Sequence, residues 1–312
     1  MGIATYFTRD RRPRLSETFR PAPGRLAYCK LCNVEDFADP ALRGVIRDVF
    51  AHELARLGPG FPGGVEYRKH WEVAMAVRTL VDFGAVHDRA EVLGVGAGDE
   101  PTIFWLTNRV RRVFATDLYL DPGVWKGFAN ASMMTDPARQ WPAAWNPRRL
   151  VVQHMNALDL AYEDDSFDAI FTSSSIEHFG THADVRRAAS EMCRVLKPGG
   201  ILSLSTEFLV EGPTPGIDGC IMFTPELVRD AILGDLPWSP VAPMEYAVSP
   251  TTWAGLRRTE DYMADWDRHH AMYGQAFWHK LDFTTYPQVL LRSPEHTFVS
   301  GHIALRKDRR AA

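Results

Sequence analysis

The sequence lacks the features that mark secreted and membrane proteins. Its four cysteines, Cys29, Cys32, Cys193 and Cys220, are too few and too unevenly spaced for a disulfide framework. No apolar run approaches the roughly 18 residues that a membrane helix needs. No apolar segment follows the first charges, as it would in a signal peptide. We therefore expect a cytoplasmic protein that does not associate with membranes.

Positive charge is also scarce. The 35 Lys and Arg residues are outnumbered by 39 Asp and Glu, which gives a net charge of −4. Basic residues gather near the two ends, at 9–20 and 306–310, so the body between them is more acidic than the whole. Because an acidic surface repels phosphates, we expect no nucleic-acid partner.

The sequence offers no complete metal site either. Cys29 and Cys32 have the spacing of one half of a zinc knuckle, but no second pair follows them. Cys193 falls on the apolar stripe of a predicted helix, and His269-His270 is more typical of a polar helix surface than of a ligand pair. We predict that the protein holds no metal.

What the chain does contain is ordinary globular composition, with 46% apolar and 24% charged residues over 312 positions. This length fits about two domains or one elaborated α/β domain. We divide it into an N-terminal arm and helical extension (1–70), a core (71–210) and a C-terminal segment (211–312). The aromatic residues of 237–283 are irregularly spaced, so this stretch is either plain core or a cover over the substrate.

Strands and helices alternate from residue 70 onward. Apolar spacing predicts helices at about 40–56, 70–84, 100–110, 182–196 and 224–233, and strands at 90–95, 112–116, 150–153, 167–171, 201–205, 286–292 and 297–305. The helix at 182–196 is expected to stop at Lys197-Pro198-Gly199-Gly200. This alternation predicts a parallel sheet with right-handed crossovers.

A glycine-rich turn follows the first strand of the core and carries Gly94, Gly96 and Gly98. Glycines at such a turn let the backbone approach a ligand closely. The spacing G-x-G-x-G differs from the G-x-G-x-x-G of dinucleotide sites, and there is no G-x-x-x-x-G-K-[ST] segment for a nucleoside triphosphate.

Polar residues follow the next three strands. Asp117-Leu118 ends the second strand, where a carboxylate can accept hydrogen bonds from a ribose diol, or alternatively can cap the next helix. Asn156-Ala157 follows the third strand and is placed to meet the edge of an adenine. Phe171 to Phe179, which includes Ser173, Ser174, Glu177 and His178, follows the fourth.

In this order and spacing, together with Arg194 to Gly200, these motifs resemble the class I S-adenosylmethionine (SAM)-dependent methyltransferases over about residues 88–208. The resemblance implies a Rossmann-like α/β fold with a seven-stranded, mostly parallel sheet and an antiparallel last strand. It also implies that SAM is the cofactor and that its binding residues are Gly94, Gly96, Gly98, Asp117, Leu118, Asn156, Ala157, Ser173 and Ser174. The family often has an acidic residue before the glycine pair and another after the third strand. This chain has Gly94 and Asn156 at those two positions.

Methyl transfer requires alignment of the acceptor more than acid catalysis, but a hydroxyl or ammonium acceptor must lose a proton. His178 is the candidate base and Glu177 the second catalytic candidate, although both are also typical of a helix start. The N-terminal helical extension and the aromatic C-terminal segment resemble those of small-molecule or sugar methyltransferases, so we expect a small-molecule acceptor, with a hydroxyl of a sugar or natural product favoured. A homodimer is possible. The alternatives are a SAM-binding partner subunit without catalysis and, less favoured, a NAD-dependent oxidoreductase.

Overall fold

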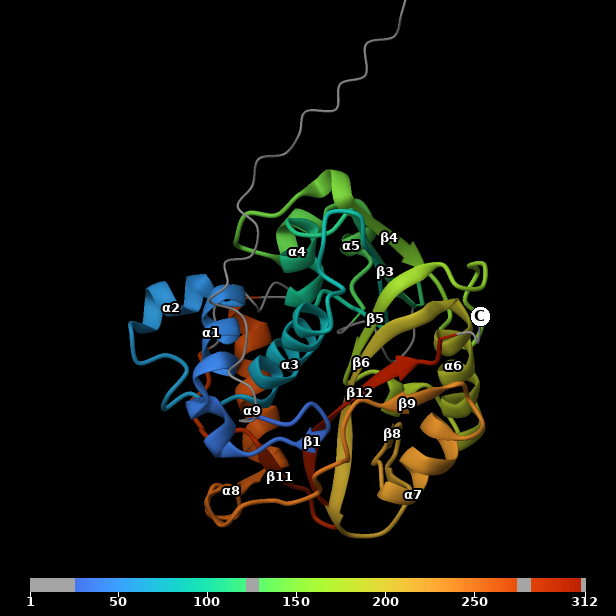
Figure 1. Ribbon diagram of the computed structural model, residues 1–312. Helices are drawn as coiled ribbons and strands as arrows, with labels where there is room; N and C mark the ends of the chain where they lie inside the picture. The colour runs from blue at the N-terminus through green and yellow to red at the C-terminus, as the bar shows by residue number, and fades with distance from the viewer. Residues whose placement is uncertain (1–25, 122–128, 274–281, 310–312) are drawn as a thin grey trace, which may run out of the picture.

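The protein is described by a computed structural model covering residues 26–121, 129–273 and 282–309 (Figure 1). The basic, proline-rich arm expected before residue 25 lies outside these residues, and so do Phe277 and Trp278 of the aromatic stretch. None of the helices in the described ranges combines the length and hydrophobicity needed to cross a bilayer.

A mixed sheet forms the centre of the fold, in the order β10-β11-β12-β6-β5-β2-β3-β4. Its central strands are β2 (Glu91–Val95), β3 (Arg112–Asp117), β4 (Leu150–His154), β5 (Phe167–Ser173), β6 (Leu196–Glu211), β11 (Leu290–Arg292) and β12 (Thr297–Lys307). Neighbours from β4 to β6 are parallel, and β12 runs antiparallel between β6 and β11. The predicted Rossmann-like α/β class with an antiparallel last strand is therefore confirmed.

The sheet is wider than the seven strands predicted, because three short strands extend it. They are β1 (Lys30–Leu31), β9 (Trp238–Pro240) and β10 (Arg257–Arg258), which bring the sheet to ten strands in the described part of the chain. One edge of β12 pairs with β6. Its other edge pairs in succession with β11, β1 and β9, which lie opposite Thr297–Val299, Gly301–His302 and Leu305–Lys307. The long edge of β12 is thus covered by segments from three distant parts of the chain.

Strands β2, β5 and β12 are apolar and largely buried, since helices cover both faces of the sheet, whereas the edge strand β4 is only partly buried. Figure 1 shows α1 (Pro40–Val49), α3 (Arg68–Asp82) and α9 (Thr259–Tyr273) on one side of the central strands and α6 (His182–Val195) on the other. The shorter helices are α2 (Ala51–Leu57), α4 (Pro101–Thr107), α5 (Ser132–Thr135), α7 (Pro225–Leu227) and α8 (Pro250–Ala254).

Three predicted elements differ in detail. The helix expected over 40–56 is broken at Phe50, whose ψ of 44° separates α1 from α2. The helix expected over 224–233 becomes α7 followed by a π-helix over Val228–Leu233. The expected stop at 197–200 lies inside β6, where the register against β5 jumps from Leu196 to Ile201 and leaves a bulge. Lys197 Nζ holds this bulge, 2.8 Å from Asp168 Oδ1.

Candidate active site

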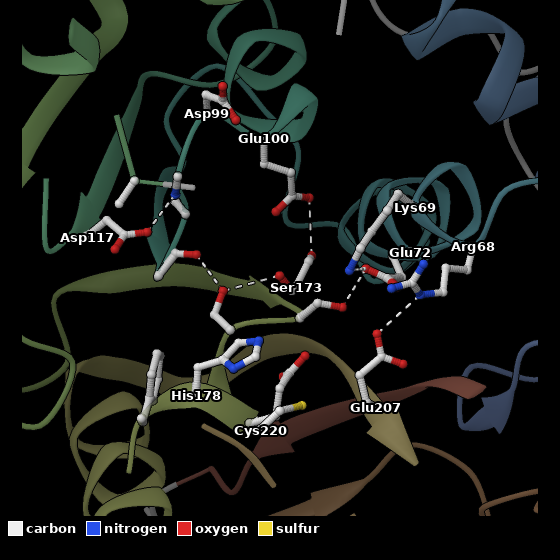
Figure 2. A pocket seen from close by; sticks show the side chains of 18 of the residues that line it. Arg68, Lys69, Glu72, Asp99, Glu100, Asp117, Ser173, His178, Glu207 and Cys220 are labelled. Atoms are coloured by element: carbon white, nitrogen blue, oxygen red, sulfur yellow. Dashed lines mark hydrogen bonds and ion pairs between the residues drawn. The ribbon is translucent and has the colours of Figure 1, made fainter. Parts of the chain in front are cut away.

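A cavity of about 690 Å³ opens at the carboxyl ends of β2, β3, β4 and β5 (Figure 2). Of the predicted site residues, its lining includes Gly96, Gly98, Asp117, Leu118, Asn156, Ala157, Ser173, Ser174, Glu177 and His178. Ligands of open α/β sheets bind at this edge. The fold thus brings together residues that lie up to 82 positions apart in the sequence.

Gly94 is the one predicted site residue outside this lining. It lies within β2, and a Cβ there would come 2.6 Å from the Phe171 ring and 2.9 Å from Ala97 Cβ. Its missing side chain makes room for the packing beneath the cavity.

The conformation of the glycine turn is fixed by its backbone torsions and by one hydrogen bond. Gly96 and Gly98 have φ values of +59° and +49°, which L side chains rarely adopt. Tyr119 Oη donates to the Gly98 carbonyl at 2.6 Å. The turn is therefore a fixed backbone surface that faces the cavity.

Asp117, at the end of β3, braces this turn from the neighbouring strand. Its carboxylate accepts the backbone N–H of Gly98 at 2.8 Å and that of Leu118 at 2.7 Å, one at each oxygen. Burial raises its pKa despite these two bonds. Because each carboxylate oxygen can accept more than one hydrogen bond, Asp117 can still receive two hydroxyl groups of a ribose.

The next part of the wall fits a flat base. Asn156 Oδ1 accepts the Leu158 N–H at 2.9 Å, which fixes the amide in an Asx turn. Leu118, Met155 and Ala157 line the cavity beside it. Apolar side chains around one turned amide could hold an adenine ring and its polar edge.

Beyond the two serines the lining becomes strongly charged. Sequence analysis predicted Glu177 and His178 here but missed the other charged residues. We call it the inner compartment: Arg68, Lys69 and Glu72 from α3, Glu100 from the turn before α4, Glu177 and His178 from the 3₁₀ turn after β5, and Glu207 from β6. Figure 2 shows Arg68, Lys69, Glu72 and Glu207 across the cavity from Asp117. The only sequence signal was the charge at the start of an otherwise apolar helix.

Ser173 and Ser174 bind the acids of this compartment. Ser173 Oγ donates to Glu100 Oε1 at 3.2 Å, and Ser174 Oγ donates to Glu72 Oε2 at 2.7 Å. Ser174 has a φ of +48°, which is uncommon for a residue other than glycine and marks local strain. Burial and the nearby Glu72 raise the pKa of Glu100 to about 7.

Two ion pairs neutralise part of the compartment. Arg68 Nε lies 3.2 Å from Glu207 Oε1, with both side chains buried, and Lys69 Nζ lies 2.9 Å from Glu72 Oε2. Burial favours the neutral form of Glu207, but the attraction of Arg68 and Lys69 outweighs it and lowers its pKa.

Glu177 is buried in the same wall, with 1% of its surface exposed. Its Oε2 accepts the Thr206 hydroxyl at 2.8 Å, while its Oε1 has no hydrogen-bond partner among the residues that the structure describes. Burial and the neighbouring Glu207 raise its pKa to about 8. Glu177 therefore holds a proton at neutral pH in the absence of a ligand.

His178, the predicted base, is anchored by the hairpin of β7 (Gly216–Ile217) and β8 (Cys220–Ile221). Its Nδ1 lies 2.7 Å from the Gly219 carbonyl oxygen. Because a carbonyl only accepts, Nδ1 carries the proton of the neutral ring, and Nε2 is the basic nitrogen. Burial lowers its pKa, so the ring is neutral and able to accept a proton near pH 7.

Residues 93–204 match the family described as methyltransferase domain. The match covers about a third of the chain and supports a class I SAM-dependent methyltransferase domain over these residues. The match contains the glycine turn, Asp117, Asn156 and the segment through His178. The cofactor of such a domain is SAM.

Sequence comparison also finds 27-O-demethylrifamycin SV methyltransferase of Amycolatopsis mediterranei. The two sequences are 38% identical over 65 residues, which are 21% of this chain and only 23% of that relative.

Among solved structures, a putative sarcosine dimethylglycine methyltransferase from Galdieria sulphuraria is 14% identical with a TM-score of 0.48. The match covers 77% of this chain and 85% of that one. The [4+2]-cyclase SpnF is 17% identical with a TM-score of 0.49, and the match covers 87% and 96%.

Part of the aromatic stretch reaches the methyltransferase cavity. Tyr262 and Trp266 of α9 line it together with Met263, and the Arg68 guanidinium lies 4.7 Å from the centre of the Tyr262 ring. Trp238, by contrast, is buried in the core, where its Nε1 donates to the Ile232 carbonyl. The stretch therefore divides between the cavity wall and the core.

The candidate metal ligands lie elsewhere. Cys29 Sγ donates to the Ala304 carbonyl, and burial raises the pKa of both Cys29 and Cys32. His269, expected at the surface, is fully buried, and its Nε2 accepts the Asp282 N–H at 3.1 Å. Among the described residues, no three His, Cys, Asp or Glu side chains are grouped to hold a metal.

Proposed function

We propose that this methyltransferase transfers a methyl group from SAM to a hydroxyl of a small-molecule acceptor bound in the inner compartment. The observation that carries this proposal is the continuity of one cavity, from the Gly96–Gly98 turn and Asp117 to Arg68, Glu177 and Tyr262. A volume of about 690 Å³ is in the range of small-molecule sites.

SAM, when bound, supplies an electrophilic methyl group on a sulfonium. The turn and Asp117 would hold its ribose and amino-acid portion, and Leu118, Met155, Asn156 and Ala157 its adenine. Tyr262, Met263 and Trp266 would exclude water and hold the acceptor, which gives the C-terminal segment 211–312 a substrate-covering role. Such alignment contributes up to roughly 7–11 kcal/mol in well-ordered cases.

Removal of the acceptor proton falls to His178. With the Nδ1 proton directed at the Gly219 carbonyl, Nε2 is the basic ring nitrogen that would accept the proton of a hydroxyl acceptor. Glu177 shares this wall, but because it holds a proton at neutral pH in the absence of a ligand, it is not available as the base there. The oxygen acceptor is supported by the name of the Amycolatopsis relative, which methylates an oxygen.

Labelled methyl transfer tests the proposal. The protein is incubated with methyl-labelled SAM and cell extracts, and products are identified by mass spectrometry beside the His178→Asn variant. We expect label in a small molecule, with little formed by the variant.

Two alternatives give different results. A partner subunit without catalysis would bind SAM in calorimetry but label nothing in any extract. An oxidoreductase would bind a nicotinamide cofactor in a fluorescence titration. The methyltransferase domain match and the G-x-G-x-G spacing both disfavour this alternative.

A further inference from the structure

The inner compartment has more acids than cations. Four carboxyl groups, Glu72, Glu100, Glu177 and Glu207, share it with two cations, Arg68 and Lys69. The two cations pair with Glu207 and Glu72. Within the described ranges, neither Glu100 nor Glu177 forms an ion pair, so two acids are left without a counter-charge.

Within the described part of the chain, the charged groups of Glu177 and Arg68 each have one atom without a hydrogen-bond partner, and the two atoms are of opposite kinds. The hydroxyl of Tyr67, which also lines the cavity, is a third such atom. Oε1 of Glu177 is an acceptor when the group is ionised, and Nη1 of Arg68 is a donor. Both side chains are buried, with 1% and 6% of their surfaces exposed, and both line the cavity. Because unpaired polar atoms at such a site are costly, a ligand that offers one donor and one acceptor would satisfy both.

We propose that the acceptor is an amino alcohol, such as an amino sugar or an aryl amino alcohol, whose ammonium group binds Glu177 and whose neighbouring oxygen accepts from Arg68. This inference rests on the proposed function, of which it specifies the substrate class. The aromatic ring of Trp266, which lines the same cavity, also favours a cation, whereas the Tyr262 ring already faces the Arg68 guanidinium.

When no ligand is bound, a proton on Glu177 neutralises this carboxyl group, which has no ion-pair partner among the described residues. The groups that face Glu177 are Glu207 on β6, Lys69 and Arg68 on α3, Cys220 on β8 and the adjacent His178. Of these, Glu207 raises the pKa of Glu177 and Lys69 lowers it, and with burial the result is a value of about 8. When the ammonium binds, the proton leaves Glu177 for solvent, and the ammonium keeps its own protons and charge.

Three matched probes test the inference. They are 2-amino-1-phenylethanol, 1-phenyl-1,2-ethanediol and mandelate, which share a phenyl carbinol and differ in carrying an ammonium, a neutral hydroxyl or a carboxylate. Their binding is measured by calorimetry on protein saturated with S-adenosylhomocysteine (SAH). We expect the amino alcohol to bind about tenfold or more tightly than the diol, the discrimination expected of a charge-assisted hydrogen bond.

The variants assign this preference to one carboxylate. Glu177→Gln should remove it while SAH binding persists, whereas Glu163→Gln, the same change at an exposed position outside the cavity, should retain it. In buffers of different ionisation enthalpy, wild-type protein at pH 7 should release about one proton per amino alcohol bound, and Glu177→Gln none.

Equal or tighter binding of the diol or of mandelate overturns the inference. So does the absence of amino-alcohol binding, or a preference that survives in Glu177→Gln. Failure of the proposed function would appear separately, as absence of methyl transfer by protein that binds SAH and still prefers the amino alcohol. Methyl transfer to neutral acceptors without that preference would leave the function standing and overturn only this inference.

Discussion

Ser175 Oγ donates to the backbone carbonyl of Gly96 at 2.5 Å, and a Cβ on Gly96 would lie 2.6 Å from Ser175 Cβ. The glycine turn after β2 and the segment after β5 are therefore in direct contact. Position 96 must be glycine because a side chain there would clash with Ser175. The shape of the turn proposed to bind the cofactor depends on this contact.

Substitution of Gly96 should consequently damage both stability and cofactor binding. Gly96→Ala places a side chain at a φ of +59° and against Ser175, so we expect the free energy of unfolding to fall by at least about 1–2 kcal/mol. SAM affinity, measured by calorimetry, should fall with it. Gly44→Ala is the control, because Gly44 lies inside α1 with nothing near its Cβ position, and it should leave SAM affinity unchanged. Wild-type SAM binding by Gly96→Ala would contradict this account of the turn.

Loss of the Asp117 carboxylate should weaken both SAM and SAH. Asp117→Ala removes the acceptor for the Gly98 N–H and the proposed acceptor for the ribose. We expect a loss of about 1.5–3 kcal/mol for each ligand, the range for a hydrogen bond to a charged group. Asp159→Ala, an exposed acid after β4 that does not line the cavity, serves as the control. Equal affinities for wild type and Asp117→Ala would remove Asp117 from the ribose role.

His178→Asn should separate catalysis from anchoring. The asparagine amide can still donate to the Gly219 carbonyl, but it cannot accept a proton as Nε2 does. We expect SAM affinity to persist, kcat to fall by roughly 10²–10⁴, and the acidic limb of the pH–rate profile, below pH 6.5 because burial lowers the pKa of His178, to flatten.

The control for this variant is His182→Asn, at the exposed start of α6, which should leave the pH–rate profile intact. A His178→Asn variant with normal turnover and a lower melting temperature would mean that His178 has only a structural role.

The buried Glu177 predicts a specific dependence of stability on pH. Its pKa rises from an ordinary 4.5 to about 8 in the folded protein, so the folded state holds a proton that the unfolded state loses. The stability that this proton confers is fully present below pH 4.5 and is lost as pH rises to about 8. The free energy of unfolding of Glu177→Gln relative to wild type should therefore increase across this window, by up to about 1.4 kcal/mol per pH unit.

Urea titrations of both proteins from pH 5 to 9 measure this difference, in which most other titrating groups cancel. Glu163→Gln should give a flat difference. A flat difference for Glu177→Gln would show that Glu177 is ionised in the folded protein.

The cofactor end of the cavity was predictable because its residues follow the ends of recognisable strands. Once 90–95, 112–116, 150–153 and 167–171 are read as parallel strands, the residues that follow each of them must meet at one edge. Asp117 and Asn156 were placed at this edge in this way, and their contact with a cofactor stays a prediction.

The inner compartment was not predictable in the same way. Arg68 and Lys69 precede the predicted helix start at residue 70, and Glu207 lies beyond the predicted strand end at 205, so the predicted elements did not include them. Their burial depends on how α3 packs against β6 and β12, a long-range arrangement that local periodicity does not encode. Gly94 was misjudged for the opposite reason, since its motif position resembles a ligand contact while its surroundings are the core.

The short strands β1 and β9, which both pair with β12, also bear on how the chain folds. Lys30 pairs with His302, and Pro240 with Leu305, so residues synthesised early find their strand partners only in the last segment of the sheet. During translation β1, β9 and one edge of β6 must wait unpaired until β12 has left the ribosome. Insertion of β12 between β6 and β11 then pairs all of these exposed strand edges together.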